Sequence, residues 1–178
     1  MNPLSRRKFA SWLALSVGPA AAPPASAQSA PCLTAEESAW LKFMREEEKL
    51  ARDVYRALYE KWNIRVFDNI SRSESRHFAS VGVLLNRYGI DDPAEGLGAG
   101  AYKDPELATL HAELLQKGMP SLKDALETGV LIEKQDIGDL ETALAKTDKT
   151  DIKTVYANLL AGSLSHLESF ESLLEILV

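Results

Sequence analysis

The chain has 178 residues, of which 46% are hydrophobic and 26% are charged, and these are ordinary values for a globular protein. They exclude a mainly disordered or collagen-like chain. The net charge of −6 argues against a general affinity for nucleic acid, which needs a basic surface. The one cysteine, Cys32, leaves no intrachain disulfide and no cysteine-based zinc site.

Residues 1–27 have the pattern of an export signal. The basic cluster Arg6-Arg7-Lys8 precedes an apolar run over 9–22, and Ala25–Ala27 supplies a cleavage site of small residues. The run is too short to span a bilayer, which needs about 20 apolar residues. The paired arginines resemble a twin-arginine signal, with an ordinary secretory signal as the alternative. We therefore expect a periplasmic or secreted protein with no stable membrane insertion after cleavage.

The remaining chain predicts an all-α domain over 34–178, after a short linker over 28–33. Thr34 and Glu37 form a capping box, and no Pro or Gly interrupts the sequence from there to about Trp62. Alternating strand patterns are absent from the sequence. Further helices are expected at about 67–88, 104–118, 121–146 and from about 150 to the C-terminus.

Four of these helices are long enough to form a four-helix bundle. About thirty residues, including the short helix over 104–118, separate the second long helix from the third, whereas the other connections are a few residues each. A long connection lets the chain cross to the far end of a bundle, so we expect one long crossover containing a short extra helix. The alternative is an up-down-up-down bundle with the short helix as a decoration.

Each long helix places a carboxylate or an imidazole on an otherwise apolar stripe. These residues are Glu48, Glu74 with His77, Glu133 and His166. Converging glutamates repel one another unless a cation lies between them, and few Lys or Arg side chains are expected to face inward. A metal ion is therefore the simplest explanation. Mixed carboxylate and imidazole ligands favour iron, with manganese as the alternative, over zinc.

Any one of these residues alone would more often be an ordinary rim or core residue, so the prediction depends on their order along four helices. Glu47 lies on a second apolar stripe and is the main competitor of Glu48. Glu168 lies two residues past His166, on the opposite face of its helix, and is not expected to bind the metal.

Two motifs resemble those of ferritins and rubrerythrins. Glu48, with Ala51 three residues on and Tyr55 seven residues on, resembles their first-helix motif. The stretch Glu74–His77 resembles their second-helix Glu-x-x-His. The segment 44–55 also resembles a family of exported or archaeal ferritin-like domains of unknown function.

The later helices continue this resemblance with one departure. Glu133, with Asp136 three residues on, resembles the acidic position of the third helix, and His166 resembles the histidine of the fourth. The di-iron pattern requires a glutamate three residues before that histidine, but Ser163 stands there. Asp136 could supply the missing carboxylate. Otherwise the site would hold one tight and one weak metal ion, or a single ion.

The resemblance implies a ferritin-like bundle with a non-haem di-iron centre. The implied ligands are Glu48, Glu74, Glu133, Asp136, His77 and His166. It implies ferroxidase, peroxidase or oxidase chemistry with oxygen or peroxide, without choosing among them, and we expect a homodimer. The alternative hypothesis is a non-enzymatic protein that binds metal or forms a helical scaffold for a partner.

Overall fold

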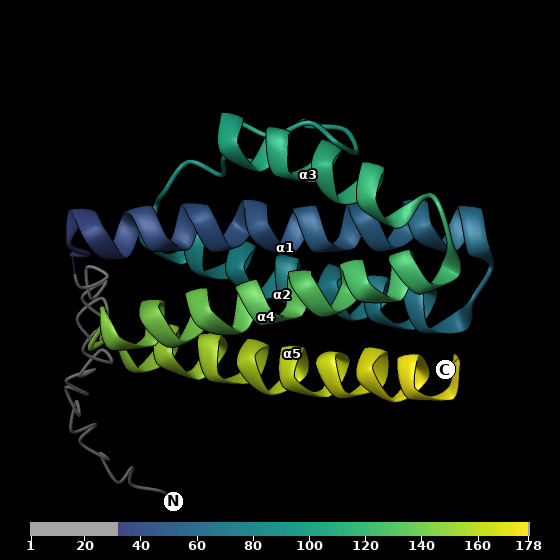
Figure 1. Ribbon diagram of the computed structural model, residues 1–178. Coiled ribbons are helices and arrows are strands. Elements are labelled where there is room, and N and C mark those ends of the chain that lie inside the picture. Colours follow the sequence, from purple (N-terminus) through teal and green to yellow (C-terminus); the bar gives the residue numbers. More distant parts are fainter. Residues whose placement is uncertain (1–31, 178) are drawn as a thin grey trace, which may run out of the picture.

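The computed structural model describes residues 32–177 (Figure 1). These residues form five helices and no strand, so the all-α prediction is confirmed. The helices are α1 (Ala35–Trp62), α2 (Arg65–Tyr88), α3 (Pro105–Gly118), α4 (Leu122–Ala145) and α5 (Thr150–Leu177). The predicted export signal lies outside the described residues.

The helix ends follow from local sequence. The side chain of Thr34 accepts a hydrogen bond from the backbone of Glu37, whose own side chain accepts one from the Thr34 backbone, which completes the predicted capping box. Asn63 ends α1 in the left-handed conformation, with φ 52°, and Gly89 ends α2 with φ 65°. Because the turn after Asn63 is short, α2 begins at Arg65, two residues before its predicted start.

The four long helices lie side by side as two hairpins, and α3 lies across the outside (Figure 1). Helix α1 packs most extensively against α2, and α4 against α5, while α3 contacts α1 and α4. The segment 89–121 carries the chain back to the end of the bundle where α2 began, so α2 and α4 run in the same direction. The long connection therefore runs from one end of the bundle to the other before α4 begins.

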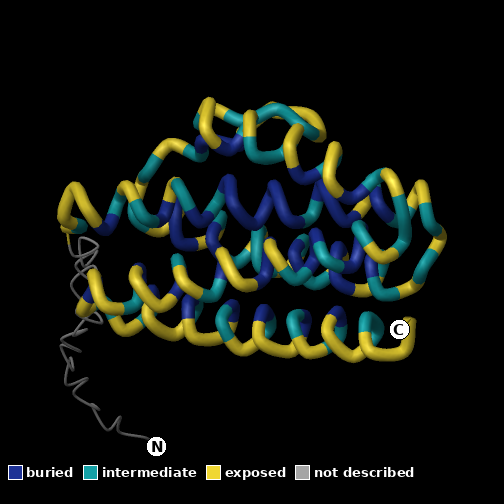
Figure 2. Tube along the Cα trace, in the orientation of Figure 1, coloured by how far each residue is buried: buried dark blue, intermediate teal, exposed yellow. Residues whose placement is uncertain are grey.

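The crossover is held to α1 by buried polar contacts. Lys49 Nζ donates to Asp53 Oδ2 and to the carbonyl of Gly98, both at 2.7 Å. The carboxylate of Glu46 accepts hydrogen bonds from the backbone N–H groups of residues 103 and 104. Figure 2 shows the consequence, since the middle turns of α1 are buried on every side.

Two apolar clusters occupy the two ends of the bundle. One includes Phe67 and Phe170, and the other includes Leu41, Leu84 and Tyr156. On each long helix the polar residues that the sequence singled out lie between the residues of one cluster and those of the other. The bundle therefore has a polar layer near its middle, closed off by hydrocarbon at both ends. No helix within 32–177 combines the length and the apolar character needed to cross a membrane.

Candidate metal centre

The six predicted site residues come together in the polar layer. Helix α1 contributes one of them, α2 two, α4 two and α5 one; they are Glu48, Glu74, His77, Glu133, Asp136 and His166. The four carboxylate residues and His166 are buried, and the side chain of His77 is 12% exposed. Five of them form the two groups of potential metal ligands described below, whereas Asp136 belongs to neither group.

The first group of three consists of Glu48, Glu74 and His77. Each offers one potential ligand atom, and these atoms lie within 4.8 Å of one another. Nδ1 of His77 is 2.7 Å from Glu74 Oε2 and 3.3 Å from Glu48 Oε2. All three residues come from α1 and α2, so the first hairpin alone builds this position.

The second group of three consists of Glu74, Glu133 and His166, again with potential ligand atoms within 4.8 Å of one another. Nδ1 of His166 is 2.7 Å from Glu74 Oε1 and 3.5 Å from Glu133 Oε2. Glu74 therefore turns one carboxylate oxygen toward each histidine. The two imidazole rings stack with their centroids 5.6 Å apart. One carboxylate shared by two carboxylate–imidazole sets is an arrangement suited to two neighbouring cations.

Several polar atoms of the site have no aligned hydrogen-bond partner within the described chain. They are Nδ1 of both histidines, Glu48 Oε1, Glu74 Oε1 and Asp136 Oδ1. The histidine nitrogens lie 2.7 Å from oxygens of Glu74, within ion-pair distance. Buried polar atoms without partners are costly, so the layer needs protons or a cation to balance it.

The pKa values show how the charges are balanced without a metal. Burial raises the pKa of Glu48, and it raises those of Glu133 and Asp136 to about 7. Burial would also raise the pKa of Glu74, but the two facing imidazoles outweigh it and lower that pKa to about 2. Burial opposes charge on His166, yet Glu133 and Glu74 raise its pKa to about 9. Protons therefore occupy the place where a cation would otherwise stabilise the carboxylates.

Two hydroxyl groups orient carboxylates of the site. The Tyr55 hydroxyl donates to Glu133 Oε1 at 2.7 Å. The Ser163 hydroxyl lies between two acceptors, Asp136 Oδ2 and the carbonyl of Leu159. Ser163 thus occupies the position where the resemblance expected a glutamate, and it contacts the carboxylate of the neighbouring helix instead. Asp136 Oδ1 stays buried and without a partner.

The sequence matches the profile of a family described as "Uncharacterized protein domain (DUF2202)" over residues 37–176, a range that contains the whole polar layer. The chain belongs to the DUF2202 family. It is also similar to "Uncharacterized protein MJ0754" of Methanocaldococcus jannaschii, with 46% identity over 142 residues, covering 80% of this chain and 77% of that protein.

Solved structures agree with the fold of this DUF2202 domain. The crystal structure of hypothetical protein MJ0754 from Methanococcus jannaschii has a TM-score of 0.79 at 45% identity, covering 80% of this chain and 82% of that one. A DUF305 fragment from Deinococcus radiodurans has a TM-score of 0.63 at 15% identity, covering 82% of this chain and 99% of the fragment. The second likeness concerns the fold alone.

Periodicity alone did not identify every important residue of the DUF2202 domain. A Cβ atom added to Gly162 on α5 would lie 2.6 Å from the His77 ring, so the absence of a side chain lets that ring reach the carboxylates. Arg52, which follows Glu48 by one turn of α1, pairs with Asp53 and with no carboxylate of the site. Glu47, the competitor of Glu48, is buried but belongs to neither group of three.

Proposed function

We propose that this protein binds two iron ions in the polar layer and oxidises ferrous iron or reduces peroxide there. The observation that carries this proposal is Glu74, which faces His77 with one oxygen and His166 with the other. Glu48 completes the first position and Glu133 the second. The sequential order of these residues on four long helices supports a ferritin-like bundle.

The donor set fits iron. Carboxylate oxygens and imidazole nitrogens suit iron and manganese, whereas closed structural zinc sites have four ligands in a tetrahedron and often use cysteine. The unpartnered buried atoms of the six site residues are all carboxylate oxygens or imidazole nitrogens. No Lys or Arg pairs with these carboxylates in the described chain. A pair of cations would satisfy them together.

Asp136 would supply the carboxylate that Ser163 cannot. The hydroxyl of Ser163 contacts Asp136 Oδ2, which leaves the buried Oδ1 free to bind a cation. Asp136 also lies close enough to Glu48 to raise its pKa, after the larger effect of burial. Asp136 lies in neither group of three, and we propose that its Oδ1 and the Ser163 hydroxyl together take the place of one glutamate.

When bound, iron would supply a ferrous–ferric couple that reacts with oxygen or peroxide. The chain's own groups hold the ligands in place and control protons. Tyr55 fixes Glu133, and the two apolar clusters restrict water at both ends of the layer. Glu133 and Asp136, whose pKa values burial raises to about 7, would release the protons they hold as a cation binds.

We further propose that the protein works outside the cytoplasm, and that it forms a homodimer as the resemblance to di-iron bundles implies. The support for export is the pattern over 1–27, and a twin-arginine pathway would suit a domain that folds and loads metal before export. Peroxide reduction would then need an external electron donor, because the one cysteine, Cys32, lies before the bundle.

The test is metal analysis of the purified chain followed by ferrous oxidation measured by absorbance. About two irons per chain, with oxygen-dependent oxidation, would support the proposal. Glu133→Gln and His77→Ala should each reduce iron binding while far-UV circular dichroism shows retained helix. A Glu141→Gln variant, exposed on α4, is the matched control. Unchanged iron content in both site variants would refute the assignment.

A second candidate function is metal binding without catalysis. The observation that favours it is Ser163, which leaves one carboxylate fewer than the resemblance requires. One tightly bound, unreactive ion per chain would support this alternative. A chain that binds no metal would exclude both functions and favour a helical scaffold.

A further inference from the structure

Glu47 is a buried carboxylate that the metal centre does not use. Its residue is 6% exposed, and Oε2 has no hydrogen-bond partner within 32–177. The neighbouring charged residues of α1 are accounted for, since Glu46 binds the crossover backbone and Lys49 pairs with Asp53. No Lys or Arg of residues 32–177 forms an ion pair with Glu47, so its burial is costly unless the carboxyl is protonated or binds a cation.

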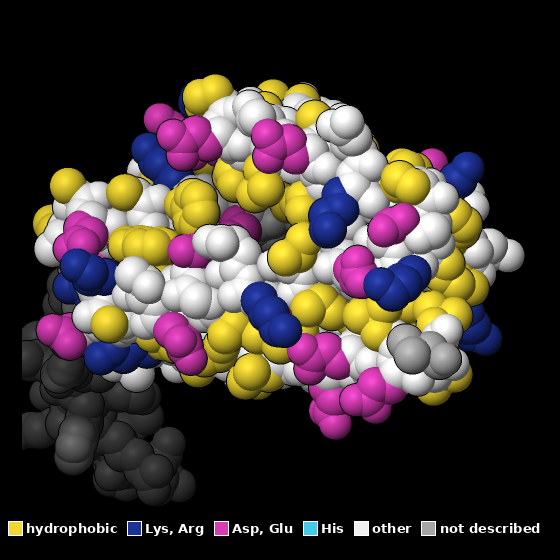
Figure 3. Space-filling model, viewed as in Figure 1, with side chains coloured by type: hydrophobic (Ala, Val, Ile, Leu, Met, Phe, Trp, Pro, Cys, Tyr) yellow, Lys and Arg dark blue, Asp and Glu magenta, His cyan; other side chains and the backbone are white. Residues whose placement is uncertain are grey.

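The Glu47 side chain lines a cavity of about 230 Å³ that is bounded by α1, α3 and α4. Leucines from α3 and α4 form much of its wall, and Leu131 there is 47% exposed. Figure 3 shows an acidic side chain inside a recess below α3 on this face. The cavity thus joins a buried carboxylate to the surface through a largely apolar opening.

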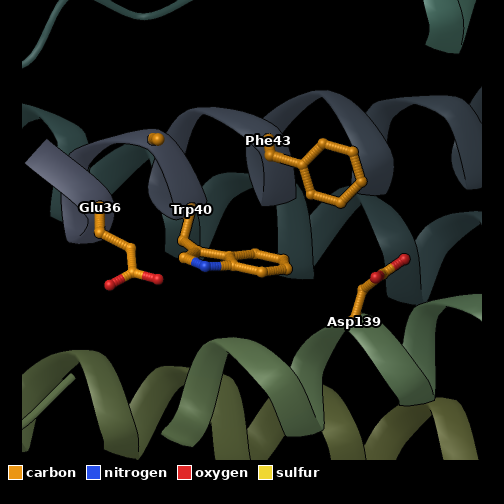
Figure 4. A pocket seen from close by; sticks show the side chains of 5 residues that line it. Glu36, Trp40, Phe43 and Asp139 are labelled. Carbon is orange, nitrogen blue, oxygen red and sulfur yellow. The ribbon is translucent and has the colours of Figure 1, made fainter. Parts of the chain in front are cut away.

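Asp139 lies beside this cavity, nearer to solvent. Its Oδ2 accepts a hydrogen bond from the amide of Gln135, which lines the same cavity as Glu47. Asp139 also lines a neighbouring hollow of about 220 Å³ with Trp40 and Phe43. Figure 4 shows its carboxylate directed from α4 into the space facing α1.

The acidic residues form a series that leads inward. Asp139, Asp136 and Glu133 are three residues apart on α4 and so lie near one helix face. Glu47 directly precedes Glu48 on α1, and it lines the same cavity as Ile132 and Gln135, which directly precede Glu133 and Asp136 on α4. The inner end of the cavity is therefore next in sequence to residues of the metal centre on both helices.

We infer that Asp139 and Glu47 form a carboxylate passage through which cations reach the metal centre from the α1–α3–α4 side of the bundle. This inference rests on the proposed metal function. Asp139 would attract the hydrated cation, and the Glu47 carboxylate would bind it transiently inside the cavity, in place of some of its bound water. Asp136 would then pass it to Glu48 and the shared Glu74. Glu47 and Asp139 are positioned as steps toward the centre and lie in neither group of three.

The experiment measures cobalt(II) loading of the full chain by stopped-flow absorbance, which reports coordination without oxidation. The variants are Glu47→Gln and Asp139→Asn, with exposed Glu141→Gln as the control. If cations enter and leave through this passage, a substitution in it changes the rates of loading and of release by the same factor. Glu47→Gln should therefore slow both loading and release to a chelator by about tenfold or more, while the dissociation constant and the number of bound ions stay the same.

A second variant blocks the passage without changing charge. Leu131→Trp at the cavity wall should slow loading and release to a similar extent, again with unchanged affinity. The effect of Asp139→Asn should shrink at high salt, because Asp139 is partly exposed and its field is screened.

Three results would overturn the inference or its basis, and they are distinguishable. Unchanged rates in Glu47→Gln and Leu131→Trp would show that cations arrive elsewhere, for example beside the histidines. A weaker affinity or a lost ion in Glu47→Gln would make Glu47 a ligand. A wild-type chain that binds no cobalt would refute the proposed function itself.

Discussion

In the metal-free protein, raising the pH from about 5.5 to about 8 should lower the free energy of unfolding. Burial raises the pKa of Glu133 from 4.5, and that of Asp136 from 3.8, to about 7. The folded state therefore holds these protons at pH values where the unfolded chain has released them. Stability falls as the pH rises toward the folded pKa, because ionisation of the folded form is penalised.

His166 changes stability in the same direction. Burial lowers its pKa, but Glu133 and Glu74 raise it from 6.5 to about 9 in the folded state. The stabilisation by the positive charge of His166 is complete below the pKa that this residue has in the unfolded chain. It is lost as the pH rises through the pKa of His166 in the folded state. Between pH about 5.5 and about 8, the ionisation change of each of Glu133, Asp136 and His166 lowers the free energy of unfolding by about 2 kcal/mol. Because they share one electrostatic environment, a net loss of about 2 to 4 kcal/mol is expected.

Urea unfolding followed by far-UV circular dichroism measures this loss, once with a chelator and once with saturating manganese(II). A bound cation takes the place of the protons, so the loaded protein should keep or gain stability over the same pH range. Glu133→Gln should weaken the pH dependence of the free energy of unfolding in the metal-free protein, and exposed Glu141→Gln should leave it unchanged. A metal-free profile that stays level or rises with pH would refute the account of the buried carboxyls.

Three further predictions test separate parts of the structure. Metal analysis of Glu74→Gln should show the loss of both ions, because Glu74 alone belongs to both groups of three. Glu48→Gln should keep the ion at the second position. Equal losses in the two variants would contradict the sharing of Glu74. Gly162→Ala should cost about 1–3 kcal/mol in chemical unfolding and weaken metal binding, because its Cβ would meet an imidazole ring at 2.6 Å. Gly138→Ala, with open space around it, is the control and should be neutral or stabilising. Asp53→Ala should destabilise the fold by about 3–5 kcal/mol, since it leaves a buried lysine unpaired; a change below about 1 kcal/mol would contradict that role.

The sequence predicted the helices and the polar layer because both depend on local periodicity. Glu48, Glu74 and His166 stand where an apolar stripe calls for hydrocarbon, and the helices bring those positions together. The crossover was predicted from its length. These inferences need a repeat of 3.6 residues and a count of connecting residues, and both can be read from one sequence.

Other features depend on contacts between segments far apart in the sequence. Periodicity gives α1 one buried face, but the crossover and α3 cover the opposite side, so Glu46 and Lys49 are buried as well. The contact of Ser163 with Asp136 requires the packing of α4 on α5. The role of Gly162 depends on the position of the His77 ring on another helix. No pattern within a single helix contains this information.

The two groups of three around Glu74 differ in what they would hold together. Glu48, Glu74 and His77 all belong to the first hairpin, whereas Glu133 and His166 belong to the second. An ion at the second position would therefore act as a non-covalent cross-link that closes a long loop, much as a disulfide does in other small domains. An ion at the first position would mainly stiffen one hairpin. Loss of the second ion should consequently loosen the two halves of the molecule from each other.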